Sequence, residues 1–310
     1  MKSIRTIFFA TIFMAGAVAA YSKDGDALPF MRIVRDPASA AMGFAGTASS
    51  STIAYSSFRN PSVIPFYGKT ADAAFSYQSW APDGVKSGNY NLGTGVKLLN
   101  GRFGLALGGA YQKGQEYKIV NESGISAGAF TPKEMLINFG VGVLVTETLS
   151  AGANVRYASE KTTSDDKLST VCTDFLITWH RKAFNVSAGI SSLGSSVKDS
   201  EDNDFGIPSS ATVAGDFDKV FGDAHGVKVG ADADYFFSGN FTFAMGAQYS
   251  WKDMLFLRAG FHYGNDDAVL PTFATAGAGI KFKGIRLEAG WLTGSKALKN
   301  TLTFGLGVSF

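Results

Sequence analysis

The chain of 310 residues has a single cysteine, Cys172, and only 8 prolines. One cysteine excludes a disulfide framework, and its place in mid-chain does not suit a lipoprotein, which is acylated at the point where its leader is cleaved. No stretch after the first twenty residues approaches the roughly 18 consecutive apolar residues that a membrane-spanning helix needs. The sequence therefore predicts neither a lipid anchor nor a helical anchor.

An excess of charge of one sign is also missing. The chain has 28 Lys and Arg against 26 Asp and Glu, and no basic block stands out. Proteins that bind nucleic acid usually carry a concentrated basic surface. We therefore expect no nucleic-acid partner, and nothing in the sequence points to a cofactor.

The first twenty residues have the pattern of a secretory signal peptide. Lys2 and Arg5 precede an apolar run over residues 7–18, which ends in small residues. This order of a basic start, a short apolar core and a small-residue site is typical of exported proteins. We expect cleavage near Ala19 and Ala20.

The chain is instead rich in glycine and aromatic residues, with 37 glycines and 13% Phe, Trp and Tyr. Such a composition suits many short strands. A mean hydropathy of +0.07 fits a barrel in which a polar lumen offsets an apolar outer face. Composition alone leaves a large soluble sandwich open as an alternative.

From about residue 70 to the C-terminus, apolar and polar residues alternate with period two, as expected for strands with one apolar face. In the last segment Leu302, Phe304 and Leu306 share a face with Val308 and Phe310. Tight turns and longer links alternate between about fourteen such segments, as in bacterial outer-membrane barrels. An even number returns the last strand to the periplasmic side.

Large aromatic residues sort between the two ends of these strands, as expected for girdles at the two faces of a membrane. At the ends with long links lie Tyr77, Tyr90, Tyr111, Tyr157, Tyr235, Tyr263 and Trp291. At the ends with tight turns lie Phe103, Trp179, Phe184, Trp251, Phe282 and Phe310. The sequence thus predicts an all-β transmembrane antiparallel β-barrel in contact with outer-membrane lipids. Its terminal Phe310 resembles the signal that the barrel-insertion machinery reads.

Residues 21–69 lack the period-two pattern and are rich in Ala and Ser. Barrels of intermediate size are often plugged by their own chain. We therefore divide the sequence into a signal peptide (1–20), an N-terminal periplasmic or luminal plug (21–69) with a short helix near residues 37–42, and a barrel (70–310).

The stretch 28–43, together with 58–62, resembles the N-terminal region of the PorV/PorQ family, which belongs to the wider FadL-like group of fourteen-stranded barrels. The positions that carry the resemblance are Phe30, Arg35, Asp36, Pro37, Ala41, Met42, Gly43, Asn60 and Pro61. The sequence departs from the family pattern at Phe44, where the family has a second glycine, and at Ser62 and Val63, where it has Ala-Gly.

Two functions follow from this resemblance, both in a Gram-negative, Bacteroidetes-type outer membrane. The first is a component or accessory of a type IX-like secretion or outer-membrane assembly complex, which recognises a protein partner. The alternative is FadL-like passive transport, in which a small hydrophobic molecule enters from the loops and leaves through a gap in the wall. We favour the first, because the short chain leaves little room for an elaborate substrate path.

The polar faces of the predicted strands direct charged residues into the lumen. Candidates are Arg156, Asp174, Asp232, Asp234, Arg258, Arg286 and Glu288. They either line a permeation path or pair with one another beneath the plug, and pairing is the favoured interpretation. The mixture of both signs argues against a strongly ion-selective pore.

Catalysis and metal binding have little support in the sequence. The three histidines, His180, His225 and His262, are dispersed, and no Gly-x-Ser-x-Gly surrounds a serine, so we predict no enzyme. The acidic loop 199–204 has oxygen ligands suited to calcium, but its spacing does not match an EF-hand. A solvated external loop is the favoured interpretation, and no metal site is assigned.

Overall fold

The computed structural model describes residues 27–80, 87–120, 126–161, 167–264, 270–293 and 301–310. The predicted signal peptide and residues 21–26 lie outside the described residues. Fourteen antiparallel strands close into one barrel, which confirms the predicted fold. In chain order the wall strands are β1 (Ala71–Trp80), β2 (Ser87–Leu98), β3 (Phe103–Lys113), β6 (Lys133–Thr146), β7 (Leu149–Lys161), β8 (Lys167–Arg181), β9 (Phe184–Gly194), β12 (Ser210–Phe221), β13 (His225–Phe236), β14 (Phe241–Trp251), β15 (Leu255–Gly264), β16 (Phe273–Phe282), β17 (Ile285–Thr293) and β18 (Thr301–Ser309).

The first and last wall strands close the barrel. β1 pairs with β18 in a register that runs from Asp72 opposite Ser309 to Ser79 opposite Leu302. The carbonyl of Phe310 then accepts hydrogen bonds from the backbone N–H groups of Thr70 and Ala71. Closure removes the free edges of the sheet. A free edge cannot be tolerated in a membrane, because its backbone N–H and C=O groups would have no hydrogen-bond partners.

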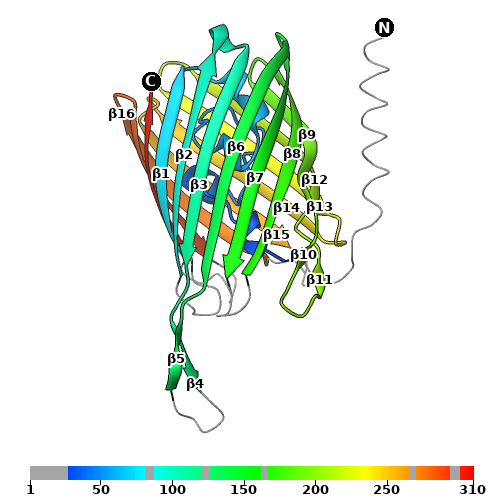
Figure 1. The fold of residues 1–310 in the computed structure, drawn as a ribbon. Helices are drawn as coiled ribbons and strands as arrows, with labels where there is room; N and C mark the ends of the chain where they lie inside the picture. Colours follow the sequence, from blue (N-terminus) through cyan, green and yellow to red (C-terminus); the bar gives the residue numbers. More distant parts are fainter. Residues whose placement is uncertain (1–26, 81–86, 121–125, 162–166, 265–269, 294–300) are drawn as a thin grey trace, which may run out of the picture.

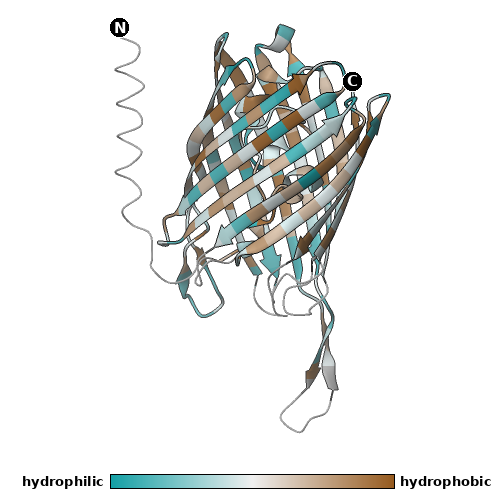
Figure 2. Ribbon diagram, turned by 180° about the vertical axis from the view of Figure 1, so that it is seen from behind, coloured by the Kyte–Doolittle hydropathy of each residue, from teal (hydrophilic) through white to brown (hydrophobic). Residues whose placement is uncertain are grey.

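The wall has an apolar outer face and a polar inner face. Outward side chains such as Leu92, Val213 and Leu257 are exposed, whereas inward residues such as Asn138 and Asp174 are buried. Hydrophobic and hydrophilic residues accordingly alternate along the strands in Figure 2. Among the described residues, no helix is long and apolar enough to cross a bilayer.

The two ends of the barrel differ (Figure 1). The turn end carries Phe310 and short connections, several of which use positive φ, as at Asn100 in the turn η6 (Leu99–Gly101) and at Lys283. The loop end carries the longer links. Aromatic residues of adjacent strands align near the loop end, where Tyr77 pairs with Tyr90 and Tyr90 with Tyr111.

Two of the longer links form ribbons that the alternation pattern does not distinguish from loops. β4 (Tyr117–Val120) pairs with β5 (Ser126–Phe130), and β10 (Val197–Lys198) pairs with β11 (Asp204–Phe205). The β4–β5 ribbon projects well beyond the barrel (Figure 1). It leaves the wall at the end opposite the C-terminus.

The segment 27–69, called the plug below, lies inside the barrel (Figure 1). It contains η2 (Pro29–Arg32), α2 (Pro37–Ala40), η3 (Ser56–Phe58) and η4 (Pro61–Phe66). Two short side chains cap its turns: Asp36 accepts from the backbone N–H groups of Ala38 and Ser39, and Asn60 accepts from that of Ser62. Proline at the first position of α2 and η4 suits these caps, because its fixed φ is helical and it has no N–H to satisfy.

Glycines of the wall let the plug backbone lie directly against the strands. A Cβ at Gly260 would lie 2.1 Å from the backbone nitrogen of Gly43, and one at Gly93 would lie 2.2 Å from the carbonyl oxygen of Ala54. A Cβ at Gly142 would likewise lie 2.2 Å from the carbonyl oxygen of Pro61. These inward glycines therefore form part of the docking surface for the plug.

Candidate functional site

Asp232 of β13 is the main acidic anchor of the plug. Its carboxylate accepts hydrogen bonds from the backbone N–H groups of Gly46 and Thr47, the latter at 3.0 Å. It also pairs with the guanidinium of Arg59 at 2.7 Å, and the same Arg59 Nη2 donates to the carbonyl of Phe44. One wall carboxylate thus holds two parts of the plug, residues 46–47 and Arg59.

Asp72 of β1 holds the next part of the plug. Its Oδ2 accepts from the backbone N–H groups of Ile53 and Ala54, at 3.0 and 3.2 Å. The guanidinium of Arg286 neutralises the same carboxylate at 2.9 Å. Asp72 is absent from the predicted site residues, although alternation along the first strand places it on the inner face with Ser76 and Gln78.

The residues that carry the family resemblance all lie in the plug. The side chain of Asn60 donates to the carbonyl of Thr47 at 2.9 Å and to the hydroxyls of Thr178 and Ser187. Asp36 caps α2 and accepts from the hydroxyl of Ser39 at 2.7 Å. The remaining motif positions, Phe30, Arg35, Pro37, Ala41, Met42, Gly43 and Pro61, are buried.

The seven charged lumen candidates all point inward, and most form ion pairs. Arg156 pairs with Asp174 at 2.8 Å across β7 and β8. Arg258 pairs with Glu288 at 2.9 Å from β15 to β17. Asp234 accepts from the hydroxyl of Thr212 at 2.5 Å, while Asp232 and Arg286 bind Arg59 and Asp72. Arg59 lies outside the alternating pattern, within the stretch 58–62 that carries the family resemblance, and is absent from the predicted site residues.

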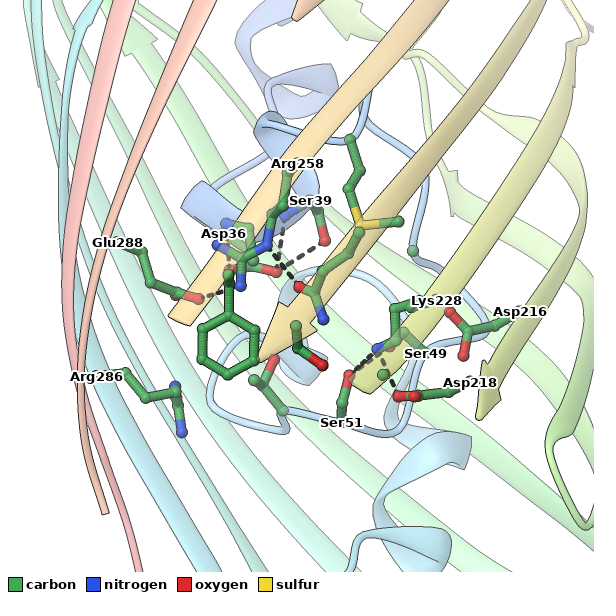
Figure 3. A pocket seen from close by; sticks show the side chains of 18 of the residues that line it. Asp36, Ser39, Ser49, Ser51, Asp216, Asp218, Lys228, Arg258, Arg286 and Glu288 are labelled. Carbon is green, nitrogen blue, oxygen red and sulfur yellow. Dashed lines mark hydrogen bonds and ion pairs between the residues drawn. The ribbon is translucent and has the colours of Figure 1, made fainter. Parts of the chain in front are cut away.

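One cavity lies between the plug and the turn end, and its volume is about 300 Å³. Figure 3 shows Arg258, Glu288 and Asp36 on one side of it and Lys228, Asp216 and Asp218 on the other. Lys228 pairs with Asp218 at 3.3 Å and donates to the hydroxyls of Ser49 and Ser51. This turn-side cavity extends to turn residues, including Asp223, Ala224, Lys252 and Asp253.

The second cavity lies between the plug and the loop end, and its volume is about 130 Å³. Its apolar lining comes from both the plug and the wall: Met31, Ile33, Val34, Phe44, Phe58, Phe236, Ala244 and Leu270. Several polar side chains complete it, among them Arg35, Arg156, Asp234 and His262. Its mixed lining distinguishes this loop-side cavity from the more charged turn-side cavity.

The two cavities share two lining residues, Thr47 and Arg59. Both are held by Asp232, through the backbone of Thr47 and the side chain of Arg59. The side chain of Arg59 keeps 19% of its surface exposed, whereas that of Asp232 keeps 2%. At this point Thr47 and Arg59 border both cavities and separate them as a single layer of residues.

The wall beside the loop-side cavity contains a bulge. The register of β8 with β9 shifts between Thr173 and Phe175, and Ser192 adopts a φ of 57°. The backbone N–H of Ser192 donates to Asp174 at 2.6 Å, which stabilises the bulge. The pairing of β9 with β12 ends at Ser191 opposite Ser210, so the last residues of β9 pair only with β8.

Calcium-type chemistry in the acidic loop has no geometric support. Asp199 accepts from the backbone N–H groups of Glu201 and Asn203 and from the side chain of Asn203, and these bonds, that side chain foremost, hold the pKa of Asp199 below its ordinary value. Lys198 pairs with Asp202 at 2.7 Å. In the described part of the chain, no group of three or more His, Cys, Asp or Glu has the arrangement of a metal site.

The three histidines occupy separate environments. The Nδ1 of His180 lies 2.6 Å from the side-chain oxygen of Asn185, and that of His225 lies 2.7 Å from the hydroxyl of Tyr249. His262 is buried and stacks on Phe273, with ring centroids 4.7 Å apart. The prediction that the chain is not an enzyme stays a prediction.

No protein-family model matches the chain, and no curated protein matches it. Solved structures of the same fold do. The toluene transporter TbuX of Ralstonia pickettii has 13% identity and a TM-score of 0.62 over 88% of this chain and 98% of its own. The monoaromatic hydrocarbon channel CymD has 13% identity and a TM-score of 0.63 over 94% and 99%. The toluene transporter TodX of Pseudomonas putida has 13% identity and a TM-score of 0.57 over 87% and 95%.

These neighbours correct the preferred functional prediction. A role in a type IX-like secretion or assembly complex is wrong, because the solved barrels that share the fold over nearly the whole chain are transporters and channels for small hydrocarbons. The PorV/PorQ resemblance at positions 28–43 and 58–62 receives no support from them. At 13% identity the comparison establishes the fold alone, a closed barrel of fourteen antiparallel strands.

Proposed function

We propose that the chain is a passive conduit for small, largely apolar molecules across the outer membrane of a Gram-negative bacterium. The observation that carries this proposal is the pair of cavities on either side of the plug, which share Thr47 and Arg59 as lining residues. The interior of the closed barrel is divided into two cavities by a single layer of residues. This is the layout of a gated passage. The fold shared with hydrocarbon channels supports the same function.

The loop-side cavity has the size of a single small ring. Its volume of about 130 Å³ is close to the roughly 150 Å³ of an engineered apolar cavity that takes up benzene. Phe44, Phe58 and Phe236 offer aromatic surface to such a guest. Burial of its apolar surface would drive entry from the loop end.

The proposed route continues past Arg59 and Thr47 into the turn-side cavity. Here the apolar lining comes from Met42, Ala45, Val63 and Phe256, beside the charged groups. Release of Arg59 and of the segment 45–47 from Asp232 would join the two cavities, and Arg59 is the more exposed member of its pair with Asp232. The rest of the plug stays in place because Asp72 binds the backbone of Ile53 and Asn60 donates to the wall hydroxyls of Thr178 and Ser187.

The membrane partners of this proposal are lipid and the insertion machinery. Outward residues such as Leu257 and Ile280 are exposed along the wall, and lipid would cover them. Phe310 is exposed at the turn end, where an insertion signal at the periplasmic face would be read.

Uptake by the purified protein in liposomes tests the function. We expect toluene to equilibrate into protein-containing vesicles faster than into empty ones, and sucrose to show no such difference, because the loop-side cavity admits only a small ring. Equal toluene rates in vesicles with and without protein would overturn the proposal. Rapid sucrose entry would show an open aqueous pore instead.

A further inference from the structure

Arginine dominates the charged lining of the loop-side cavity. Arg32, Arg35, Arg59 and Arg156 line it, and among the described residues Asp234 alone contributes a carboxylate to the lining. Arg59 and Arg156 are neutralised from the wall by aspartates. The guanidinium of Arg32 lies 3.6 Å from the ring centroid of Phe236.

Arg35 differs from Arg59 and Arg156 because no carboxylate pairs with it among the described residues. Its Nη2 donates to the carbonyl of Phe30 at 2.6 Å, whereas its Nη1 is buried without a hydrogen-bond partner. The residue is 3% exposed, and burial lowers the pKa of Arg35 to about 10. Glu134 of β6 opposes this effect electrostatically but does not line the cavity. A buried guanidinium in this state is stabilised by any anion that reaches it.

His262 supplies a second unused polar group to the same cavity. The residue is 4% exposed, and neither ring nitrogen has a hydrogen-bond partner. Its ring packs against those of Phe44 and Phe273, with centroid distances of 5.6 and 4.7 Å. A guest that fills the cavity therefore meets apolar surface together with buried nitrogens of Arg35 and His262 that have no hydrogen-bond partner.

We propose that the preferred ligand of the loop-side cavity is a compact aryl carboxylate, an inference that rests on the proposed function. The carboxylate of this ligand binds Arg35, and its ring packs on Phe44, Phe236 and Leu270. An arginine fork matches the geometry of a carboxylate and can donate two parallel hydrogen bonds. The ring occupies the apolar remainder of the cavity, whose volume is about 130 Å³. A neutral hydrocarbon would fill the same space and leave the Nη1 of Arg35 without a hydrogen-bond acceptor.

Calorimetric titration of the detergent-solubilised barrel with benzoate and benzyl alcohol tests the inference, because the two probes share ring and size but differ in charge. We expect benzoate to bind the native chain at least about tenfold more tightly, as one charge-assisted contact predicts. Arg35→Met should remove this preference, and Arg35→Lys should keep part of it. Arg102→Met, at an exposed arginine in a turn-end link, should leave it unchanged.

Equal affinities for the two probes in the native chain, or a preference that survives in Arg35→Met, would overturn the inference. If Arg35→Met does not fold, the Arg35→Lys variant decides the test. A benzoate preference in Arg35→Lys as large as in the native chain would show that the guanidinium takes no part. The proposed function is judged separately by toluene uptake. Toluene uptake without a benzoate preference would support the proposed function and rule out this ligand. A benzoate preference without toluene uptake would support this ligand and rule out the proposed function.

Discussion

At the scale of single residues, Asp232 connects plug and wall through more hydrogen bonds than any other wall residue that the structure describes. It neutralises Arg59 and accepts two backbone N–H groups, those of Gly46 and Thr47. A buried pair that loses one partner leaves an uncompensated charge, which costs about 3–5 kcal/mol. Part of Arg59 remains exposed, so solvent screening reduces this cost here.

We therefore expect Asp232→Asn to loosen the partition at Arg59 and to raise the rate of toluene uptake several-fold. Hydrogen exchange should also quicken at residues 44–59. The matched control is Asp202→Asn, which breaks the exposed pair with Lys198 and should alter neither quantity. Unchanged or slower uptake in Asp232→Asn would argue against a gate at this position.

Individual residues also show what could be predicted from the sequence. Leu302 to Phe310 alternate without interruption, so the wall and its two faces follow from side-chain period alone. Asp72 lies on the inner face by the same rule. The alternation rule does not apply to Arg59, because its position depends on how the irregular plug segment folds inside the barrel.

At the scale of elements, the plug and the wall are complementary in shape. The backbone of residues 42–43 lies so close to β15 that only glycine fits at position 260. Alternation identifies Gly260 as an inward residue, but which part of the plug it meets depends on a contact between distant segments. The ribbons β4–β5 and β10–β11 escape prediction for a related reason, since two to five residues are too few for a period to show.

We expect Gly260→Ala to destabilise the protein by about 1–3 kcal/mol, the usual cost of overpacking. Gly215→Ala is the control, because a Cβ at Gly215 meets nothing within 4 Å, and its effect should stay within about 0.5 kcal/mol. Urea unfolding in lipid vesicles measures both. Equal midpoints for the two variants would contradict the tight docking of the plug on β15.

At the scale of the whole molecule, a closed wall with an apolar exterior requires a membrane. The protein should fractionate with outer membranes and should migrate differently on a denaturing gel before and after heating, because a closed barrel resists detergent. Recovery from the soluble periplasm would be incompatible with the exposed apolar band that includes Leu92, Val213 and Leu257.

The central claim is that small molecules cross the barrel by moving past the plug, and a disulfide between plug and wall tests it directly. A Cβ at Gly230 would lie 3.6 Å from the Cβ of Ala45, which suits a disulfide. In a Cys172→Ser background, we expect oxidised Ala45→Cys/Gly230→Cys barrels in liposomes to lose most toluene uptake and reductant to restore it. Toluene uptake by the two single-cysteine variants should not change when reductant is added. Equal uptake by the oxidised and reduced double variant would contradict passage past the plug.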